Sequence, residues 1–141
     1  MKQYIGTKTL NAKPMTRAEW CEFRGWALPT DEKGEDAGYL VEYTDGGKPN
    51  HPDFAGYISW SPSYVFEKAY IAIGNVGHLQ PHQQRVVGEA AELNDKLTKL
   101  KAFLDGKFFP ALPVAEQSNL ISQSAFMKRY HSTLLDRIAA F

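Results

Sequence analysis

The spacing of apolar residues divides the chain into two parts. From residue 81 onward, apolar side chains recur every three or four positions, which is the period of an amphipathic helix. One stripe comprises Val86, Ala90, Leu93, Leu97, Leu100 and Leu104, and a second comprises Leu120, Met127, Leu134 and Ile138. Asp105 and Gly106 end the first stripe, and residues 107–113 connect the two. The pattern predicts a long antiparallel hairpin of two helices over residues 81–141.

Residues 1–73 lack this helical period and alternate between β-forming segments and turn residues. A strand is expected in 4–13, on the evidence of Ile5, Thr7, Thr9 and Leu10, and further strands are expected over 38–43 and 57–60. Residues 44–47, Thr-Asp-Gly-Gly, are typical of a turn. This part of the chain is therefore predicted to form a small antiparallel sheet.

Two short helices are expected beside these strands. Thr16 and Glu19 have the spacing of a capping box, so a helix should begin at Thr16, carry Trp20 and Phe23 on one face and end at Gly25. Ser61 should cap a second helix, with Pro62 in its first position and its end near Tyr70. The predicted fold class is α+β, with a module over 1–73, a linker over 74–80 and the hairpin over 81–141.

Aromatic residues are concentrated in the first part of the chain. We expect most of them to form the core of the small sheet, and the sequence indicates no ligand surface there. The residues concerned are Tyr39, Tyr43, Tyr57, Trp60 and Tyr64.

The predicted hairpin has more apolar surface than it can bury alone. Each helix is about 35–40 Å long at 1.5 Å per residue, and two packed helices have no second layer. The module could cover part of the excess, but we expect hairpins from several chains to pack together, because four or more helices close a core. The side chains that need partners are Val87, Phe103, Ile121, Phe126 and Leu135.

Composition narrows the classes of function. The 16 basic and 16 acidic residues balance, which disfavours a protein that coats duplex nucleic acid. Cys21 is the single cysteine, so no internal disulfide can form and a reducing compartment fits. The sequence has no apolar stretch approaching a membrane span of about 20 residues and no apolar run typical of a signal peptide. We therefore expect a soluble, cytosolic protein that does not contact a membrane.

No motif in the sequence predicts catalysis. Phosphate loops, dinucleotide-binding glycine patterns and zinc-protease motifs are all missing. His78 and His82 are four residues apart, but Pro81 argues against one helix carrying both. Cys21 lies in the predicted amphipathic helix, where a buried, inert thiol is expected. We expect neither a metal, a cofactor nor an enzymatic activity.

Two arginines indicate a possible anion site. Arg85 lies near the start of the first long helix and Arg137 near the end of the second, and these ends meet in an antiparallel hairpin. A guanidinium suits phosphate because its planar fork donates two hydrogen bonds, and the helix start adds free backbone N–H groups. The alternative is that both arginines are solvated or pair with Glu89 and Asp136.

A second candidate site lies at the connection between the two helices. Phe108 and Phe109 are adjacent there, and Asn119 follows in the first turns of the second helix. One phenylalanine could stack on a base while Asn119 reads its polar edge. The alternative, that the phenylalanines cap the hairpin core, is expected to hold for at least one of them.

The hairpin sequence resembles a family of phage counter-defence proteins, the anti-CBASS and anti-Thoeris cyclic-nucleotide sponges. The similar segments are 82–89 (HQQRVVGE), 92–104 (ELNDKLTKLKAFL) and 130–141, which includes Arg-Ile-Ala-Ala. The first part resembles a module recurrent in phage proteins, in YIGTK at 4–8, AKPMT at 12–16, RGW at 24–26 and GYISWSP at 56–62. Because anti-CBASS sponges are essentially the hairpin alone, the added module makes the chain more similar to the anti-Thoeris sponges.

The resemblance implies a phage protein that acts in the host bacterial cytoplasm and binds immune signals without cleaving them. It implies dimers assembled into a hexamer, with cyclic ADP-ribose isomers in one kind of pocket and cyclic di- or trinucleotides in another. Arg85 and Arg137 match the oligonucleotide site, and Phe109 and Asn119 match the ADP-ribose-type site, where Phe108 could replace Phe109. The alternative function is an accessory module that inhibits a host protein by binding it.

Overall fold

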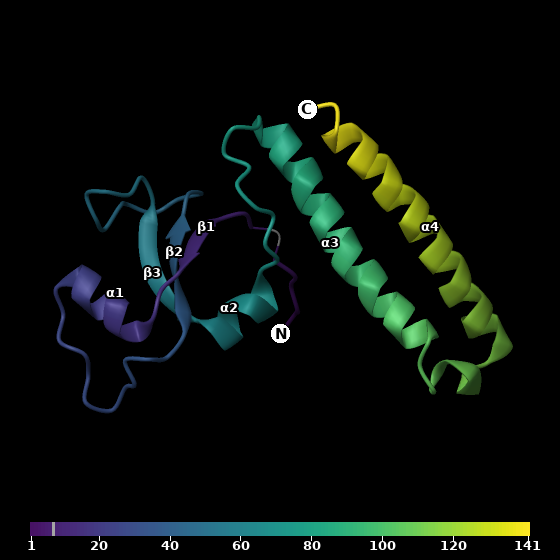
Figure 1. Cartoon of the computed structure of the whole chain (residues 1–141), viewed down its shortest axis with the longest axis horizontal. Helices are drawn as coiled ribbons and strands as arrows, with labels where there is room; N and C mark the ends of the chain where they lie inside the picture. The colour runs from purple at the N-terminus through teal and green to yellow at the C-terminus, as the bar shows by residue number, and fades with distance from the viewer. Residues whose placement is uncertain (7) are drawn as a thin grey trace. The chain divides into compact units, whose positions relative to one another are not determined.

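The computed structural model describes residues 1–6 and 8–141, which form two compact units (Figure 1). The first unit is Met1–Tyr70 and the second is Ile71–Phe141. The first contains a small sheet with two short helices, and the second contains two long helices packed together, which confirms the predicted α+β class.

The first unit is built on a three-stranded antiparallel sheet in the order β1–β2–β3. Its strands are β1 (Asn11–Pro14), β2 (Gly38–Tyr43) and β3 (Tyr57–Pro62). The second strand has the predicted bounds, and the third runs two residues further than predicted. The strand expected in 4–13 is displaced, since β1 begins only at Asn11; Thr7 lies outside the described residues. Asn11 pairs with Glu42, and β2 ends one residue later at Tyr43, so it offers no partner to Ile5 or Thr9.

Helix α1 (Arg17–Arg24) forms as the capping pattern predicts. The Thr16 hydroxyl accepts from the Glu19 N–H, and the Glu19 carboxylate accepts from the Thr16 N–H at 2.7 Å. Gly25 ends the helix with φ of 68°, a left-handed conformation that favours glycine. Trp20 and Cys21 are buried against Leu40 and Ile58, so the thiol lies in the core as expected.

Helix α2 (Ser63–Ala69) begins one residue later than predicted. Pro62 is the N-cap rather than the first helical residue, and the Ser61 side chain does not cap the helix. The reason is that Pro62 still pairs with Gly38 across the sheet, which keeps it extended. At its end, the ring of Phe66 stacks on that of Tyr70, the C-cap residue, with ring centroids 4.9 Å apart.

The sheet aromatics are less buried than the sequence suggested. Tyr57 is 45% exposed and Tyr64 is 68% exposed, whereas Leu40 and Ile58 fill the core. Tyr39, Tyr43 and Tyr57 alternate with the residues that contact α1 and therefore lie on the opposite face of the sheet. Trp60 alone of the five aromatics packs against the core cluster. The prediction that most of them form the core is therefore wrong.

The second unit is the predicted antiparallel hairpin. Helix α3 (Pro81–Leu104) starts at Pro81, a short 3-10 helix η1 (Phe109–Ala111) lies in the connection, and α4 (Val114–Ile138) returns along α3 (Figure 1). The predicted stripes face each other, but only part of each is fully buried: Val86, Ala90, Leu97 and Leu134.

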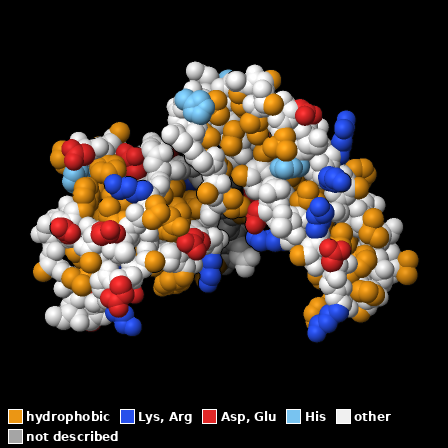
Figure 2. Space-filling model, viewed as in Figure 1, with side chains coloured by type: hydrophobic (Ala, Val, Ile, Leu, Met, Phe, Trp, Pro, Cys, Tyr) orange, Lys and Arg blue, Asp and Glu red, His pale blue; other side chains and the backbone are white. Residues whose placement is uncertain are grey.

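Large apolar side chains remain on the hairpin surface. Phe126 is 74% exposed, Ile121 55% and Leu135 49%, and hydrophobic side chains are visible over this unit in Figure 2. Spacing of 14 residues places Ile121 and Leu135 on one side of α4. Self-association through these side chains stays a prediction.

Leu134 should be the residue on which the hairpin depends most, because it is 1% exposed. We expect Leu134→Ala to lower the free energy of unfolding by about 2–5 kcal/mol, the usual cost of removing a buried leucine side chain. Urea denaturation followed by circular dichroism at 222 nm measures this. Ser132→Ala, on the exposed side of α4, should change it by less than about 0.5 kcal/mol, and equal losses would contradict the assignment.

Candidate functional site

The open end of the hairpin, where α3 begins and α4 ends, is held by a small apolar cluster. Val86 and Ala90 of α3 pack with Leu134 of α4, and Leu93 and Ile138 lie against them. Arg85 directly precedes Val86, and Arg137 directly precedes Ile138. The cluster therefore brings the two predicted arginines to the same end of the hairpin.

The two arginines also lie on the same side of the hairpin. Glu89 follows Arg85 by four residues, so these two side chains lie on one side of α3. Tyr130 precedes Arg137 by seven residues, so these two side chains lie on one side of α4. The Tyr130 hydroxyl donates a hydrogen bond to the Glu89 carboxylate, which joins these two sides. We call these four residues the arginine cluster: Arg85, Glu89, Tyr130 and Arg137.

Neither guanidinium of the arginine cluster is occupied within the described chain. Arg85 and Arg137 are exposed, and the part of the chain that the structure describes offers neither of them an ion pair. The expected alternative was that both arginines are solvated or pair with Glu89 and Asp136. The described residues contain neither ion pair, and Glu89 is bonded to Tyr130 instead, whereas the exposure of both arginines is what solvated side chains would show. Both guanidinium forks are left to bind an external group.

Glu89 and Arg137 shift the pKa of the Tyr130 phenol in opposite directions. Its hydrogen bond to Glu89 raises the pKa of Tyr130 above the ordinary value of 10.0, because ionisation would place a second negative charge beside the carboxylate. The positive charge of Arg137 opposes this and lowers that pKa. At neutral pH the phenol is therefore a proton donor held on Glu89, on the side of the hairpin that carries both arginines.

The start of α3 offers fewer free donors than the sequence suggested. Pro81 has no N–H, and the Gln83 N–H already donates to the Gln80 carbonyl at 2.9 Å. The Gln80 N–H in turn donates to the Gln83 side chain, also at 2.9 Å. The helix terminus is largely satisfied by its own residues, so anion binding at this end would depend mainly on the guanidinium groups.

At the closed end of the hairpin, Phe108 and Phe109 differ in their contacts and in their exposure. Phe109 starts η1 and packs edge-on against Phe103, with ring centroids 6.5 Å apart. Phe108 is 67% exposed, and the Lys107 ammonium lies 5.2 Å from its ring centre. As expected, one of the pair covers the hairpin, and it is Phe109. Phe108 has the larger free surface in the single chain.

Asn119 is exposed in the second turn of α4. It precedes Tyr130 by 11 residues, about three helical turns, so the two lie along the same side of α4. Phe103 follows Glu89 by 14 residues and likewise lies near the arginine-cluster side of α3. The arginine cluster and Asn119 therefore lie along one side of the hairpin, the cluster at its open end and Asn119 toward its closed end. Of the second predicted site, Phe109 is placed by its contact with Phe103 on the same side, and among the described residues it has no contact with Asn119.

Sequence reasoning missed Tyr130 as a member of the site and treated Glu89 only as a partner for arginine. The spacing contained part of the signal, because Arg85 and Glu89 are four apart and Tyr130 and Arg137 seven apart. What spacing could not supply is the register between the helices, which sets Glu89 opposite Tyr130.

The described residues contain neither a candidate metal centre nor a candidate membrane span. Within them, no group of three His, Cys, Asp or Glu side chains is placed to hold a metal ion. No helix in the described ranges is long and apolar enough to cross a membrane.

Replacing Glu89 should bring the pKa of Tyr130 back toward its ordinary value. We expect Glu89→Gln to lower the pKa of Tyr130, because the charge that opposes ionisation is gone while Arg137 remains. Carbon-13 NMR of labelled tyrosine across the pH range measures this, with Tyr130→Phe assigning the resonance among seven tyrosines.

The sign of this effect also sets a pH dependence. Since the folded-state pKa of Tyr130 is raised, the Glu89–Tyr130 bond stabilises the fold fully below about pH 10 and is lost as the pH rises through that raised value.

The control for Glu89→Gln is Glu92→Gln, which affects only the Lys96 pair on the same helix and should leave the pKa of Tyr130 unchanged. A Tyr130 titration identical in wild type and Glu89→Gln would refute the contact.

Comparison with known proteins matches the hairpin alone. Residues 80–140 match the family described as Sequestin, which covers less than half of the 141-residue chain and stops short of the first unit. No curated protein and no solved structure matches the chain. The matched range contains the whole arginine cluster, both phenylalanines and Asn119, so every predicted site residue belongs to the part of the chain that is similar to this family.

Proposed function

We propose that this chain sequesters, without cleaving, the cyclic oligonucleotide and cyclic ADP-ribose-type signals of bacterial immune systems. It would do so as a phage counter-defence protein in the host bacterial cytoplasm. The observation that supports this most is that the segment matching a family named for sequestration is also the segment that carries two free arginines on one side. The resemblance to phage sponges supplies the class of ligand.

The arginine cluster suits a small cyclic ligand with more than one phosphate. Each guanidinium can donate two parallel hydrogen bonds to one phosphate, and the two arginines come from different helices of a fixed hairpin. Glu89 leaves the cluster a net charge of about +1, enough to attract a compact anion and too little to hold duplex nucleic acid. The exposed Tyr130 ring, 46% accessible, offers a face for a base or ribose of the same ligand.

Sequestration requires slow release, which a single open side of a hairpin does not provide. The exposed apolar residues Ile121, Phe126 and Leu135 would be covered if hairpins pair and the pairs assemble, from dimer to hexamer. A pocket completed by a second copy would bury more of the ligand and slow its dissociation. We therefore include homo-oligomerisation in the proposal.

The ADP-ribose-type ligand is assigned to the closed end. Phe109 or its neighbour Phe108 would stack on the base, and Asn119 would bond its polar edge, since a side-chain amide both donates and accepts. An accessory module that binds a host protein is the competing function, and the exposed apolar side chains favour it equally. The sequestering function and the host-protein-binding function are distinguished by whether the chain binds a small ligand.

Removing both arginines should abolish binding of cyclic oligonucleotides. For Arg85→Ala/Arg137→Ala we expect affinity for cyclic di- and trinucleotides to fall by about 100-fold or more, because two charge-assisted contacts are lost. Isothermal titration calorimetry measures the affinity, and light scattering should show an unchanged oligomer.

A matched control removes the same charge elsewhere. Lys101→Ala/Lys128→Ala takes one cation from each helix, and both lysines are exposed, so binding should stay within about 3-fold of wild type once long-range attraction is screened by salt. Equal losses in the two double variants would mean that only net charge matters, and unchanged affinity in the arginine variant would overturn the site.

The two phenylalanines should separate the two ligand classes. We expect Phe109→Ala to weaken cyclic ADP-ribose-type ligands by about 10-fold or more, the usual cost of losing one stacked base, while cyclic oligonucleotide affinity is kept. Phe108→Ala is the matched variant, and a larger loss there would transfer the stacking role to Phe108. Equal weakening of both ligand classes by Phe109→Ala would contradict two separate pockets.

A further inference from the structure

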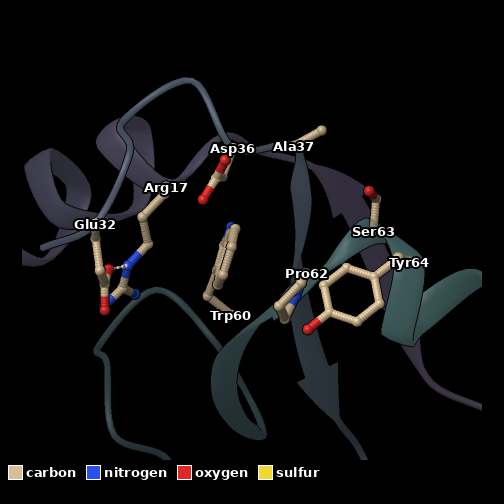
Figure 3. Close-up of a pocket in the computed structure, with 8 residues that line it drawn as sticks. All are labelled: Arg17, Glu32, Asp36, Ala37, Trp60, Pro62, Ser63 and Tyr64. Carbon is tan, nitrogen blue, oxygen red and sulfur yellow. Dashed lines mark hydrogen bonds and ion pairs between the residues drawn. The ribbon is translucent and has the colours of Figure 1, made fainter.

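The first unit contains a pocket that the proposed function does not use. A hollow of about 510 Å³ lies between the start of α1, the loop before β2 and the junction of β3 with α2 (Figure 3). This is within the usual range for small-ligand sites. It is lined by Arg17, Glu32, Asp36, Ala37, Trp60, Pro62, Ser63 and Tyr64. All eight residues precede the segment that matches the Sequestin family.

The walls of the pocket are fixed before any ligand arrives. The Arg17 N–H donates to the Asp36 carbonyl at 3.0 Å, and the Ser63 N–H donates to the Ala37 carbonyl at 2.9 Å. The indole N–H of Trp60 donates to the Met15 carbonyl at 2.8 Å. These bonds tie the loop to both neighbouring helices, so a ligand would not have to order the site.

Arg17, the one cationic side chain among the described residues that line the pocket, is already engaged. The Arg17 guanidinium donates to Glu32 through both Nε and a terminal nitrogen, the latter at 3.1 Å from Oε1. It also lies over the Trp60 ring, 5.2 Å from the ring centre. Its fork is therefore unavailable to a phosphate or carboxylate, which argues against an anionic ligand.

One carboxylate of the lining, that of the exposed residue Asp36, has no counter-ion among the described residues. Asp36 points toward the Trp60 indole in Figure 3, and within the described ranges its carboxylate has neither an ion pair nor a side-chain hydrogen bond. With Arg17 and Glu32 cancelling, the lining carries a net charge of −1. Tyr64, 68% exposed, lies beside Pro62 and adds an open aromatic surface.

We propose that this pocket binds the guanidinium group of an arginine side chain from a partner protein. A planar guanidinium can bond the Asp36 carboxylate through its fork and stack on an aromatic ring. The intramolecular contact of Arg17 with Trp60 shows that an aromatic of this pocket already accepts such a group. Because Tyr64 is mostly exposed at the site, a side chain projecting from a protein surface can reach it.

The test is an NMR titration of the full chain with N-acetyl-L-arginine amide, followed at the Trp60 indole N–H, one of three such resonances. We expect saturable shifts at Trp60 and at the amides of residues 36, 37, 63 and 64. N-acetyl-citrulline amide, which has nearly the same shape but no charge, should give none. Saturable binding of citrulline, or no shift with arginine, would overturn the proposal.

Variants locate the site and separate the two sources of a guanidinium. Asp36→Asn should weaken binding by about 10-fold or more, whereas Asp31→Asn, in the same loop but outside the pocket, should not change it. Undiminished binding in Asp36→Asn would refute the site. Free arginine should bind no better than the capped residue, and a strong preference for free arginine would make this a metabolite site and contradict a protein partner.

Discussion

The packing of Val86 and Ala90 around Leu134 is the contact on which the open end of the hairpin depends. A two-helix hairpin has no second layer, so few of its side chains are buried, and three of the four fully buried ones belong to this cluster. It fixes the register of α3 against α4. Through that register it sets Glu89 beside Tyr130 and places Arg85 and Arg137 on one side. Without it the arginines would be two unrelated surface charges.

Because the hairpin has no second layer of helices, its exposed apolar side chains favour the self-association that the proposed function requires. Apolar side chains such as Phe126 remain in water, and covering them with further copies would complete a core and enclose the exposed arginine cluster at once. Binding and assembly would then be coupled, because a ligand held between copies stabilises their association. The first unit has its own core of Trp20, Cys21, Leu40 and Ile58, so its pocket does not depend on this assembly.

The sequence predicted the parts of the fold that local rules determine. The capping box at Thr16, the left-handed glycine at Gly25 and the two helical stripes each depend on residues a few positions apart. It misplaced β1 and the start of α2 because a strand ends where its partner ends, and the pairing of Gly38 with Pro62 is not visible in either segment alone.

The candidate site, like the fold, could be predicted only where neighbouring residues or the hairpin topology determine it. Arg85 and Arg137 could be assigned to one end from the hairpin topology, but the partner of Glu89 required the register between helices. The packing of Phe109 rather than Phe108 against Phe103 depends on the 3-10 turn in the connection, which has no clear signal in the sequence. Asp36 and Tyr64 come together only through the folded sheet, so the pocket of the first unit could not be foreseen.

Sequestration is tested most directly by mixing the purified chain with a panel of cyclic ADP-ribose isomers and cyclic di- and trinucleotides. The protein is then separated, denatured, and the released material identified by chromatography and mass spectrometry. If the chain sequesters such signals, at least one ligand is depleted from solution and recovered chemically intact. Depletion of none would contradict sequestration and favour a host-protein partner, and recovery of an altered ligand would contradict binding without cleavage.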